Sequence, residues 1–89
     1  MYTARILAPA SRALQRIDPP VARRIANRIR WLAEHFEEIT PEPLHGELAG
    51  FCKYREGDYR IVYEPIRKER LLIVHAIGHR SEIYKKGKA

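Results

Sequence analysis

Cysteine is nearly absent from this chain. Cys52 is the single cysteine among 89 residues, so no disulfide can form within the chain. No obvious set of metal ligands accompanies it, and we expect no cofactor. Because Cys52 falls on the apolar face of a predicted strand, we expect its side chain to be buried as a small hydrophobic residue. A thiol of this kind suits a reducing compartment, and we expect a cytoplasmic protein.

Long hydrophobic runs are also absent. The apolar stretch near the N-terminus is short and is broken by Arg5 and Pro9, which excludes a signal-peptide core and a membrane-spanning segment. Internal repeats and low-complexity tracts are missing too. We therefore expect one soluble domain over residues 1–89 without membrane contact, in which residues 85–89 (KKGKA) form a flexible basic tail.

Positive charge is what the sequence has in excess. Lys and Arg number 17 and Asp and Glu 11, so the formal net charge is +6. A basic domain of this size favours an acidic partner, either a nucleic acid or an acidic protein. Charge alone does not choose between them.

The segment 51–63 (FCKYREGDYRIVY) predicts a β-hairpin that gathers cations on one face. Gly57 fits either a Gly57-Asp58 type II′ turn or a Glu56-Gly57 type I′ turn. In both cases odd positions before the turn share a face with even positions after it. Lys53, Arg55 and Arg60 then line one face, while the other is largely apolar and aromatic.

The remaining pattern predicts an α+β domain in the order β-α-α-β-β-β. We expect a first strand over 2–8, a short helix ending near 17, and a second helix over about 19–38 that Asp18 caps. Apolar residues recur along that helix at spacings of three and four, and its arginines are interpreted as a solvated face. A polar loop over 64–70 and a strand over 71–77 that Gly78 breaks complete the domain. Two helices then cover one face of a mainly antiparallel sheet, and the basic side chains emerge on the open face.

A second polar cluster follows the last strand at residues 79–84 (HRSEIY). If this segment folds back over the open face, Arg80 and Tyr84 join Lys53 and Arg60. Such a set suits metal-free RNA cleavage, which needs a base for the ribose 2′-OH, cations for the phosphorane and an acid for the leaving oxygen. Guanidinium groups bind two phosphate oxygens at once and stay charged.

Three segments resemble the RelE/ParE toxin superfamily, and its RelE branch in particular. They are residues 44–50 (LHGELAG), 53–63 (KYREGDYRIVY) and 77–84 (IGHRSEIY). The resemblance implies that Lys53 is a catalytic lysine, that Arg60 and Arg80 are phosphate-binding and catalytic arginines, and that Tyr84 is a catalytic tyrosine. It matches Arg55 to a basic position of the same strand.

Two residues depart from the family's pattern. Some relatives carry a lysine where this chain has Phe51, which we expect to stack on an RNA base. Related toxins use a histidine near His79 as acid or base, and we expect His79 to bind RNA; a strand-end histidine bonded to backbone is the alternative interpretation. His75, inside an apolar strand, is interpreted as structural.

The resemblance implies the toxin of a type II toxin–antitoxin pair, a metal-independent endoribonuclease that cleaves mRNA in the ribosomal 30S A site and inhibits translation. Its partners would be a cognate antitoxin, the ribosome and mRNA, with DNA reached only through the antitoxin. The first alternative is a ParE-like inhibitor of DNA gyrase without RNase activity. A third interpretation is a catalytically inactive relative that acts as a component of a repressor.

Overall fold

The structure, a computed structural model, describes residues 1–84. Two helices follow the first strand: α1 spans Ala8–Arg16 and α2 spans Pro19–His35, after which Phe36–Glu38 form one 3₁₀ turn. Both helices have a proline in their first turn, where no intrahelical donor is needed. Asp18 occupies the N-cap position of α2, but its side chain makes no capping hydrogen bond, so this part of the prediction is wrong.

Five strands form one mixed sheet. They are β1 (Thr3–Ile6), β2 (Glu42–Pro43), β3 (Cys52–Glu56), β4 (Tyr59–Ile66) and β5 (Leu71–His79), in the spatial order β1-β5-β4-β3-β2. β1 and β5 are parallel and the other neighbours are antiparallel. The predicted α+β class and its mainly antiparallel sheet are confirmed, with one short additional strand, β2.

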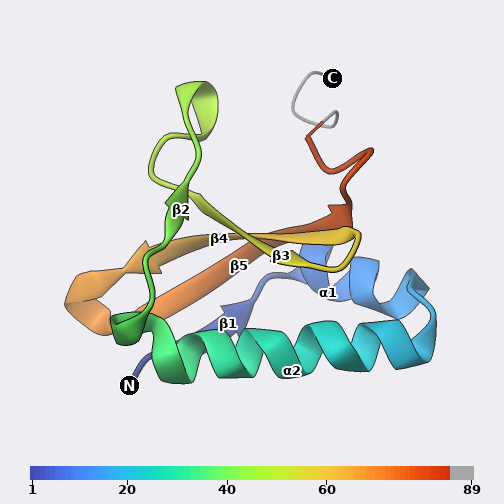
Figure 1. Cartoon of the computed structure of the whole chain (residues 1–89), viewed down its shortest axis with the longest axis horizontal. Coiled ribbons are helices and arrows are strands. Elements are labelled where there is room, and N and C mark those ends of the chain that lie inside the picture. Colours follow the sequence, from blue (N-terminus) through green and yellow to red (C-terminus); the bar gives the residue numbers. More distant parts are fainter. Residues whose placement is uncertain (85–89) are drawn as a thin grey trace.

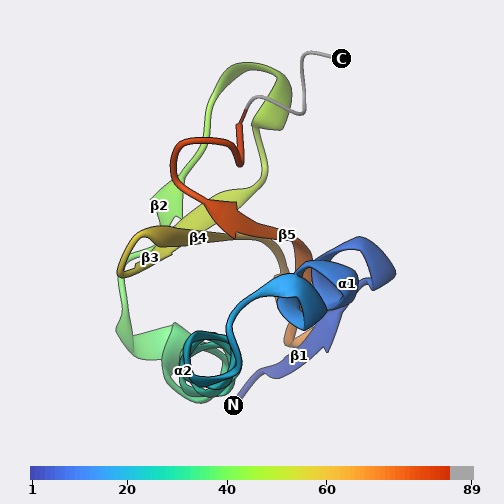
Figure 2. The same ribbon diagram turned by 90° about the vertical axis from the view of Figure 1, so that its right-hand side faces the viewer.

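The sheet and the helices form two layers. α1 packs against β5 and α2 against β1, and Figure 1 shows both helices beneath the sheet. The connector between β2 and β3 and the segment after β5 rise from the opposite side of the sheet (Figure 2). The apolar positions of α2 are buried as expected, and the core between the layers includes Ile25, Ile29, Leu32, Phe36, Cys52, Ile61 and Tyr63.

Three boundaries differ from the sequence prediction. β4 continues through Pro65 to Ile66, where a polar loop was expected. Proline is tolerated there because β3 pairs with β4 only as far as Tyr63, so that Glu64–Ile66 have β5 as their sole partner strand. Gly78 does not end β5, which continues to His79, with Gly78 paired to Arg60.

The β3–β4 register selects one of the two predicted turns. Arg55 lies opposite Arg60 and Glu56 opposite Tyr59, so Gly57 and Asp58 form the two-residue loop. Gly57 has a positive φ of 60°, whereas the φ of Asp58 is not positive. That combination is typical of a type II′ turn.

One irregularity lies in β5. Val62 pairs with Ala76, whereas the next residue, Tyr63, pairs with Val74, so His75 is the extra residue of a β-bulge. Val74 and Ile77 both face the core. The two residues between them, His75 and Ala76, therefore both lie on the open face.

Within residues 1–84, no helix is long and apolar enough to cross a membrane. The basic tail predicted for residues 85–89 lies outside the described residues.

Candidate functional site

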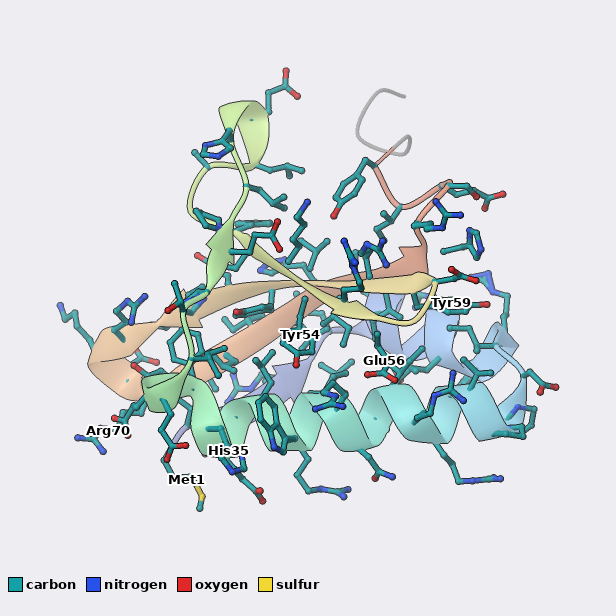
Figure 3. All side chains as sticks on the ribbon, in the orientation of Figure 1. Met1, His35, Tyr54, Glu56, Tyr59 and Arg70 are labelled. Carbon is teal, nitrogen blue, oxygen red and sulfur yellow. The ribbon has the colours of Figure 1, made fainter. Side chains whose placement is uncertain are left out.

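The strand register places three cations on the open face of the sheet. Arg55 and Arg60 are direct cross-strand partners, and Lys53 pairs with Val62, one position diagonal from Arg60. Tyr54 and Glu56 alternate with them and point from β3 toward α2 (Figure 3). The sequence predicted this separation, because side chains alternate strictly along a strand.

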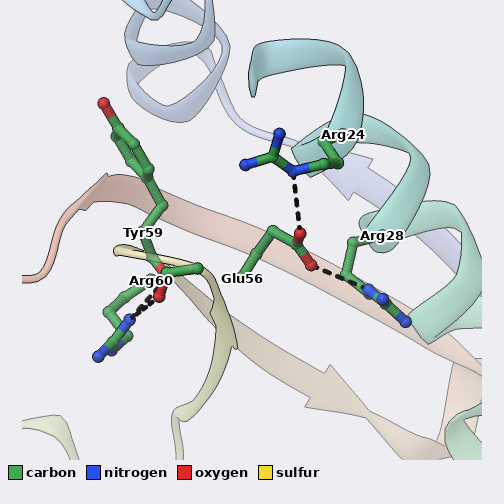
Figure 4. Close-up of polar contacts among 6 residues, drawn as sticks. Arg24, Arg28, Glu56, Tyr59 and Arg60 are labelled. Atoms are coloured by element: carbon green, nitrogen blue, oxygen red, sulfur yellow. Dashed lines mark hydrogen bonds and ion pairs between the residues drawn. The ribbon is translucent and has the colours of Figure 1, made fainter. Parts of the chain in front are cut away.

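The guanidinium of Arg60 is held by the hairpin turn. Its Nη1 donates to the carbonyl oxygens of Gly57 at 3.0 Å and Tyr59 at 2.9 Å, as Figure 4 shows. An arginine has five N–H donors, so these contacts orient the group and leave further donors for an anion. The side chain is half-buried, which strengthens its interaction with a bound phosphate.

The segment after β5 is tied to the same turn. The backbone N–H of Arg80 donates to the Asp58 carbonyl at 2.8 Å, and Arg80 Nε lies 3.4 Å from Asp58 Oδ1. Arg60 and Arg80 are therefore both anchored on the Gly57-Asp58 turn. The predicted approach of Arg80 to Arg60 agrees with this geometry.

Ile83 fixes the rest of that segment. Its side chain is buried, and a Cβ atom added to Gly78 would lie only 2.9 Å from Ile83 Cδ1. Gly78 is paired with Arg60, so a side chain at position 78 would point to the open face. Glycine at this position therefore leaves room for the segment to fold back over that face. Tyr84 follows directly and is exposed.

Lys53 has a carboxylate partner that sequence reasoning missed. Glu42 of β2 lies opposite Lys53, with 3.4 Å between Glu42 Oε2 and Lys53 Nζ. A cavity of about 290 Å³ opens beside them at this edge of the sheet. The sequence signal was Glu42 between two prolines, a composition typical of a short edge strand, but its register with β3 was not predictable.

His79 does not join the cations. It pairs with Tyr59, whose position in β4 lies on the helix side of the sheet, and the two rings meet edge to face at 5.6 Å. His79 also lines a pocket with Ala13 and Ile17. Its Nδ1 accepts from the backbone N–H of Ser81 at 3.1 Å, which agrees with the alternative interpretation of a backbone-bonded histidine.

His75 lies on the open face, where sequence reasoning expected a structural residue. Its ring stacks on Phe51 with 4.6 Å between centroids and 26° between planes. Its Nε2 lies 3.0 Å from Glu64 Oε1. Phe51 is thus on the expected face, but with a partner that the bulge in β5 supplies.

The arginines of α2 are only partly a solvated face. Arg28 Nε donates to Glu56 Oε1 at 3.0 Å, and Arg24 Nε to Glu56 Oε2 at 3.4 Å (Figure 4). Arg28 also lies over the ring of Trp31 at 5.1 Å. Glu56 is the last residue of β3, so these contacts tie the hairpin that carries the cations to the helix layer.

The described residues hold no cluster of three or more His, Cys, Asp or Glu side chains suited to a metal ion. The open face offers the three cations, the Glu42 carboxylate beside Lys53 and the Glu64 carboxylate beside His75. Such a surface can bind a phosphodiester and stabilise added negative charge on it.

A family model described as the ParE toxin of type II toxin–antitoxin system, parDE, matches residues 4–84. Toxin RelG of Mycobacterium tuberculosis is 26% identical over 85 residues, which are 96% of this chain and 98% of that protein.

Several solved structures are similar in fold. The toxin–antitoxin complex RelBE2 from Mycobacterium tuberculosis contains a chain with a TM-score of 0.80 and 26% identity, covering 89% of this chain and 98% of that one. The isolated Escherichia coli RelE toxin has a TM-score of 0.72 at 21% identity, covering 99% of this chain and 96% of that one. At the latter identity the likeness concerns the fold alone.

Proposed function

The chain belongs to the ParE toxin family of type II toxin–antitoxin systems, and within that family we propose that it is a ribosome-dependent endoribonuclease that cleaves mRNA in the A site. One observation carries the proposal: Arg60 and Arg80 are anchored on one turn, on the sheet face that also bears Lys53 and Arg55. A protein that only binds another protein has no evident need for such a cluster of cations. The likeness to RelG and to the chain in the RelBE2 complex supports the same branch.

The proposed reaction is transesterification at one phosphodiester. The ribose 2′-oxygen attacks the adjacent phosphorus, a P–O2′ bond forms, and the bond from phosphorus to the 5′-oxygen of the next nucleotide breaks. The proton of the 2′-OH passes to a base, and the leaving 5′-oxygen receives a proton from an acid. The products are a 2′,3′-cyclic phosphate and a 5′-hydroxyl.

Each of the predicted catalytic residues has a role in this scheme, and so does Arg55. Arg60 and Arg80 bind the non-bridging oxygens as charge develops on the phosphorane. Lys53 and its partner Glu42 supply the base. The Glu42 carboxylate, 3.4 Å from the Lys53 ammonium, is the proton acceptor, and Lys53 is the cation beside it. Tyr84 orients the phosphate or stacks on a base, and Arg55 extends the positive surface along the RNA.

The proposed partners follow from the family. Related structures are toxin–antitoxin complexes, and we propose a cognate antitoxin that covers the open face in the inactive state. The ribosome and mRNA are the proposed targets, which places the action in the cytoplasm. The ribosome would position the substrate and so restrict cleavage to translated messages.

The second candidate function is inhibition of DNA gyrase, and the description of the matching family as a ParE toxin favours it. It predicts growth arrest with intact mRNA and requires no transfer of protons at Lys53. An inactive repressor component is the third candidate, and it predicts neither effect.

Cleavage mapping by primer extension on a defined mRNA, with and without translating ribosomes, tests the proposal. Wild-type protein should give ribosome-dependent cuts within A-site codons. Arg60→Ala should lower the cleavage rate by about 10²-fold, close to 3 kcal/mol of transition-state stabilisation. Arg12→Ala on the exposed surface of α1 is the matched control and should cleave like wild type.

Two results would reject the endoribonuclease. Intact mRNA during growth arrest, together with inhibited supercoiling in a gyrase assay, would establish the gyrase alternative. Equal cleavage by Arg60→Ala and wild type would remove Arg60 from the mechanism.

A further inference from the structure

The open face beyond the cations carries an aromatic and acidic cluster formed by Phe51, His75 and Glu64. Phe51 and His75 stack at 4.6 Å, and His75 Nε2 meets Glu64 Oε1 at 3.0 Å. All three side chains are half-buried: His75 retains 30% and Glu64 35% of its side-chain exposure. The stacked rings and one carboxylate are therefore accessible from the solvent side of the sheet.

The cluster lies in line with the phosphate-binding cations. Phe51 precedes Lys53 by two residues on the same face, a distance of about 7 Å along a strand. Lys53, Val62 and Ala76 form one row across β3, β4 and β5, in which Val62 is buried. The row of Arg55 and Arg60 is thus followed by the row that contains Lys53 and then by the aromatic rings, so one nucleotide can place its phosphate on the cations and its base on the rings.

From this arrangement we infer that Phe51, His75 and Glu64 form a nucleobase subsite that selects the nucleotide beside the cleaved phosphate and disfavours uracil. The inference rests on the proposed endoribonuclease function and deepens it. Aromatic rings stack on any base and are sequence-tolerant. Discrimination therefore comes from the carboxylate, which only accepts hydrogen bonds.

The chemistry of the base edges explains the direction of selection. Adenine, cytosine and guanine each present an exocyclic amino group that donates to a carboxylate oxygen. Uracil presents two carbonyl oxygens beside its single N–H, and these repel Glu64. Glu64 Oε1 already accepts from His75 when Nε2 is protonated, so His75 fixes the direction of the carboxylate while the second oxygen faces the base.

Base selection is tested first, on messages in which each nucleotide around the cut is varied in turn among the four bases. Wild type should cleave sites with uracil about tenfold less often than sites with an amino-bearing base at one of these positions. Glu64→Gln should bring this ratio close to one, because an amide both donates and accepts. The ratio is internal to each reaction and so is independent of total activity. Glu34→Gln, which removes the same charge from the exposed face of α2, should keep the wild-type ratio.

Binding is tested separately, without ribosomes, by fluorescence anisotropy of labelled RNA trinucleotides whose 2′-OH groups are replaced by hydrogen. Phe51→Leu should weaken binding about fivefold or more without changing the salt dependence, since stacking is lost and no charge is removed. Lys53→Ala should lower the slope of log K against log salt by about 0.7, the value for one phosphate contact on a single strand.

The two assays separate the subsite from the endoribonuclease. If no message is cut but Phe51→Leu still weakens trinucleotide binding, the nucleobase subsite is supported and the proposed endoribonuclease reaction is rejected. If messages are cut without any discrimination against uracil, or if Glu64→Gln keeps the full discrimination, the base-selective role of the subsite is overturned. Unchanged binding by Phe51→Leu would remove the stacking role.

Discussion

Tyr63 and Cys52 are neighbouring core residues, and burial makes the Tyr63 hydroxyl and the Cys52 thiol harder to deprotonate. Tyr63 is fully buried, and among the described atoms its hydroxyl has no partner in hydrogen-bond geometry, although the Cys52 thiol is close enough to affect it. Burial raises the pKa of the Tyr63 hydroxyl and of the Cys52 thiol, because a charged form in the core loses its hydration.

This burial predicts a loss of stability in alkali. In the unfolded chain the thiol and the phenol release their protons near pKa values of 9.0 and 10.0, whereas in the folded chain both groups release them at higher pH. Above about pH 9 the unfolded state thus binds fewer protons, and the free energy of unfolding falls as pH rises. Urea unfolding at pH 8 and pH 10.5 measures the loss. Tyr63→Phe should show a smaller loss than wild type, and an equal loss in both would contradict the assignment.

Single residues also show what sequence reasoning can and cannot reach. The shared face of Lys53, Arg55 and Arg60 was predictable, because alternation along a hairpin depends on local geometry alone. The pairs Glu42–Lys53 and Glu64–His75 were not, since each depends on the register between strands that a turn or a bulge sets. The residue-by-residue roles of Lys53, Arg60, Arg80 and Tyr84 stay predictions.

At the scale of elements, the fold-back of residues 80–84 depends on one apolar contact. Ile83 is buried against Gly78, outside the main core, and the same segment carries Arg80 and Tyr84. The hairpin turn contributes two contacts to Arg80 as well. The element is therefore short, held at few points, and adjacent to the proposed reaction centre.

Ile83→Ala should release this element without unfolding the domain. Deleting a buried isoleucine to alanine costs about 2–5 kcal/mol in a core, but here the cost falls on a terminal segment that opens locally. Hydrogen exchange at residues 80–84 should rise, message cleavage should fall at least tenfold, and the melting temperature should change little. Ile6→Ala, at an exposed position of β1, is the control. Unchanged exchange would contradict the anchoring role.

The elements themselves were predictable to different degrees. Both helices and the β3–β4 hairpin followed from periodicity and turn chemistry. β2 was missed because two residues carry no periodic signal. β4 and β5 were predicted too short because Pro65 and Gly78 usually interrupt strands; here the free edge beyond Tyr63 tolerates the proline, and the approach of Ile83 requires the glycine.

At the scale of the whole molecule, the net charge is +6, and the three lysines of residues 85–89 contribute half of it. Both layers pair part of their positive charge internally, through Glu42 beside Lys53 on the open face and through Glu56 on the helix layer. A partner of opposite charge is therefore attracted from a distance.

The charge predicts how the cognate antitoxin associates. We propose an acidic, partly helical antitoxin segment, whose association rate should fall about tenfold or more between 50 and 500 mM salt because steering is screened. Stopped-flow mixing of purified toxin and antitoxin measures this rate. The dissociation rate should change far less. A salt-independent association rate would show that apolar contacts alone guide the encounter.

The parallel pairing of β1 with β5 makes the first strand depend on the last. Thr3 pairs with Leu71 and Ile6 with Val74, so a chain that stops before residue 71 leaves β1 and β4 without the strand that joins them. Only a transcript that is intact through codon 79 encodes a complete sheet. If the protein cuts messages, as proposed above, it also limits its own synthesis. Every cut in its transcript upstream of that codon yields a translation product that lacks part of the sheet and cannot fold, so the amount of active toxin does not rise.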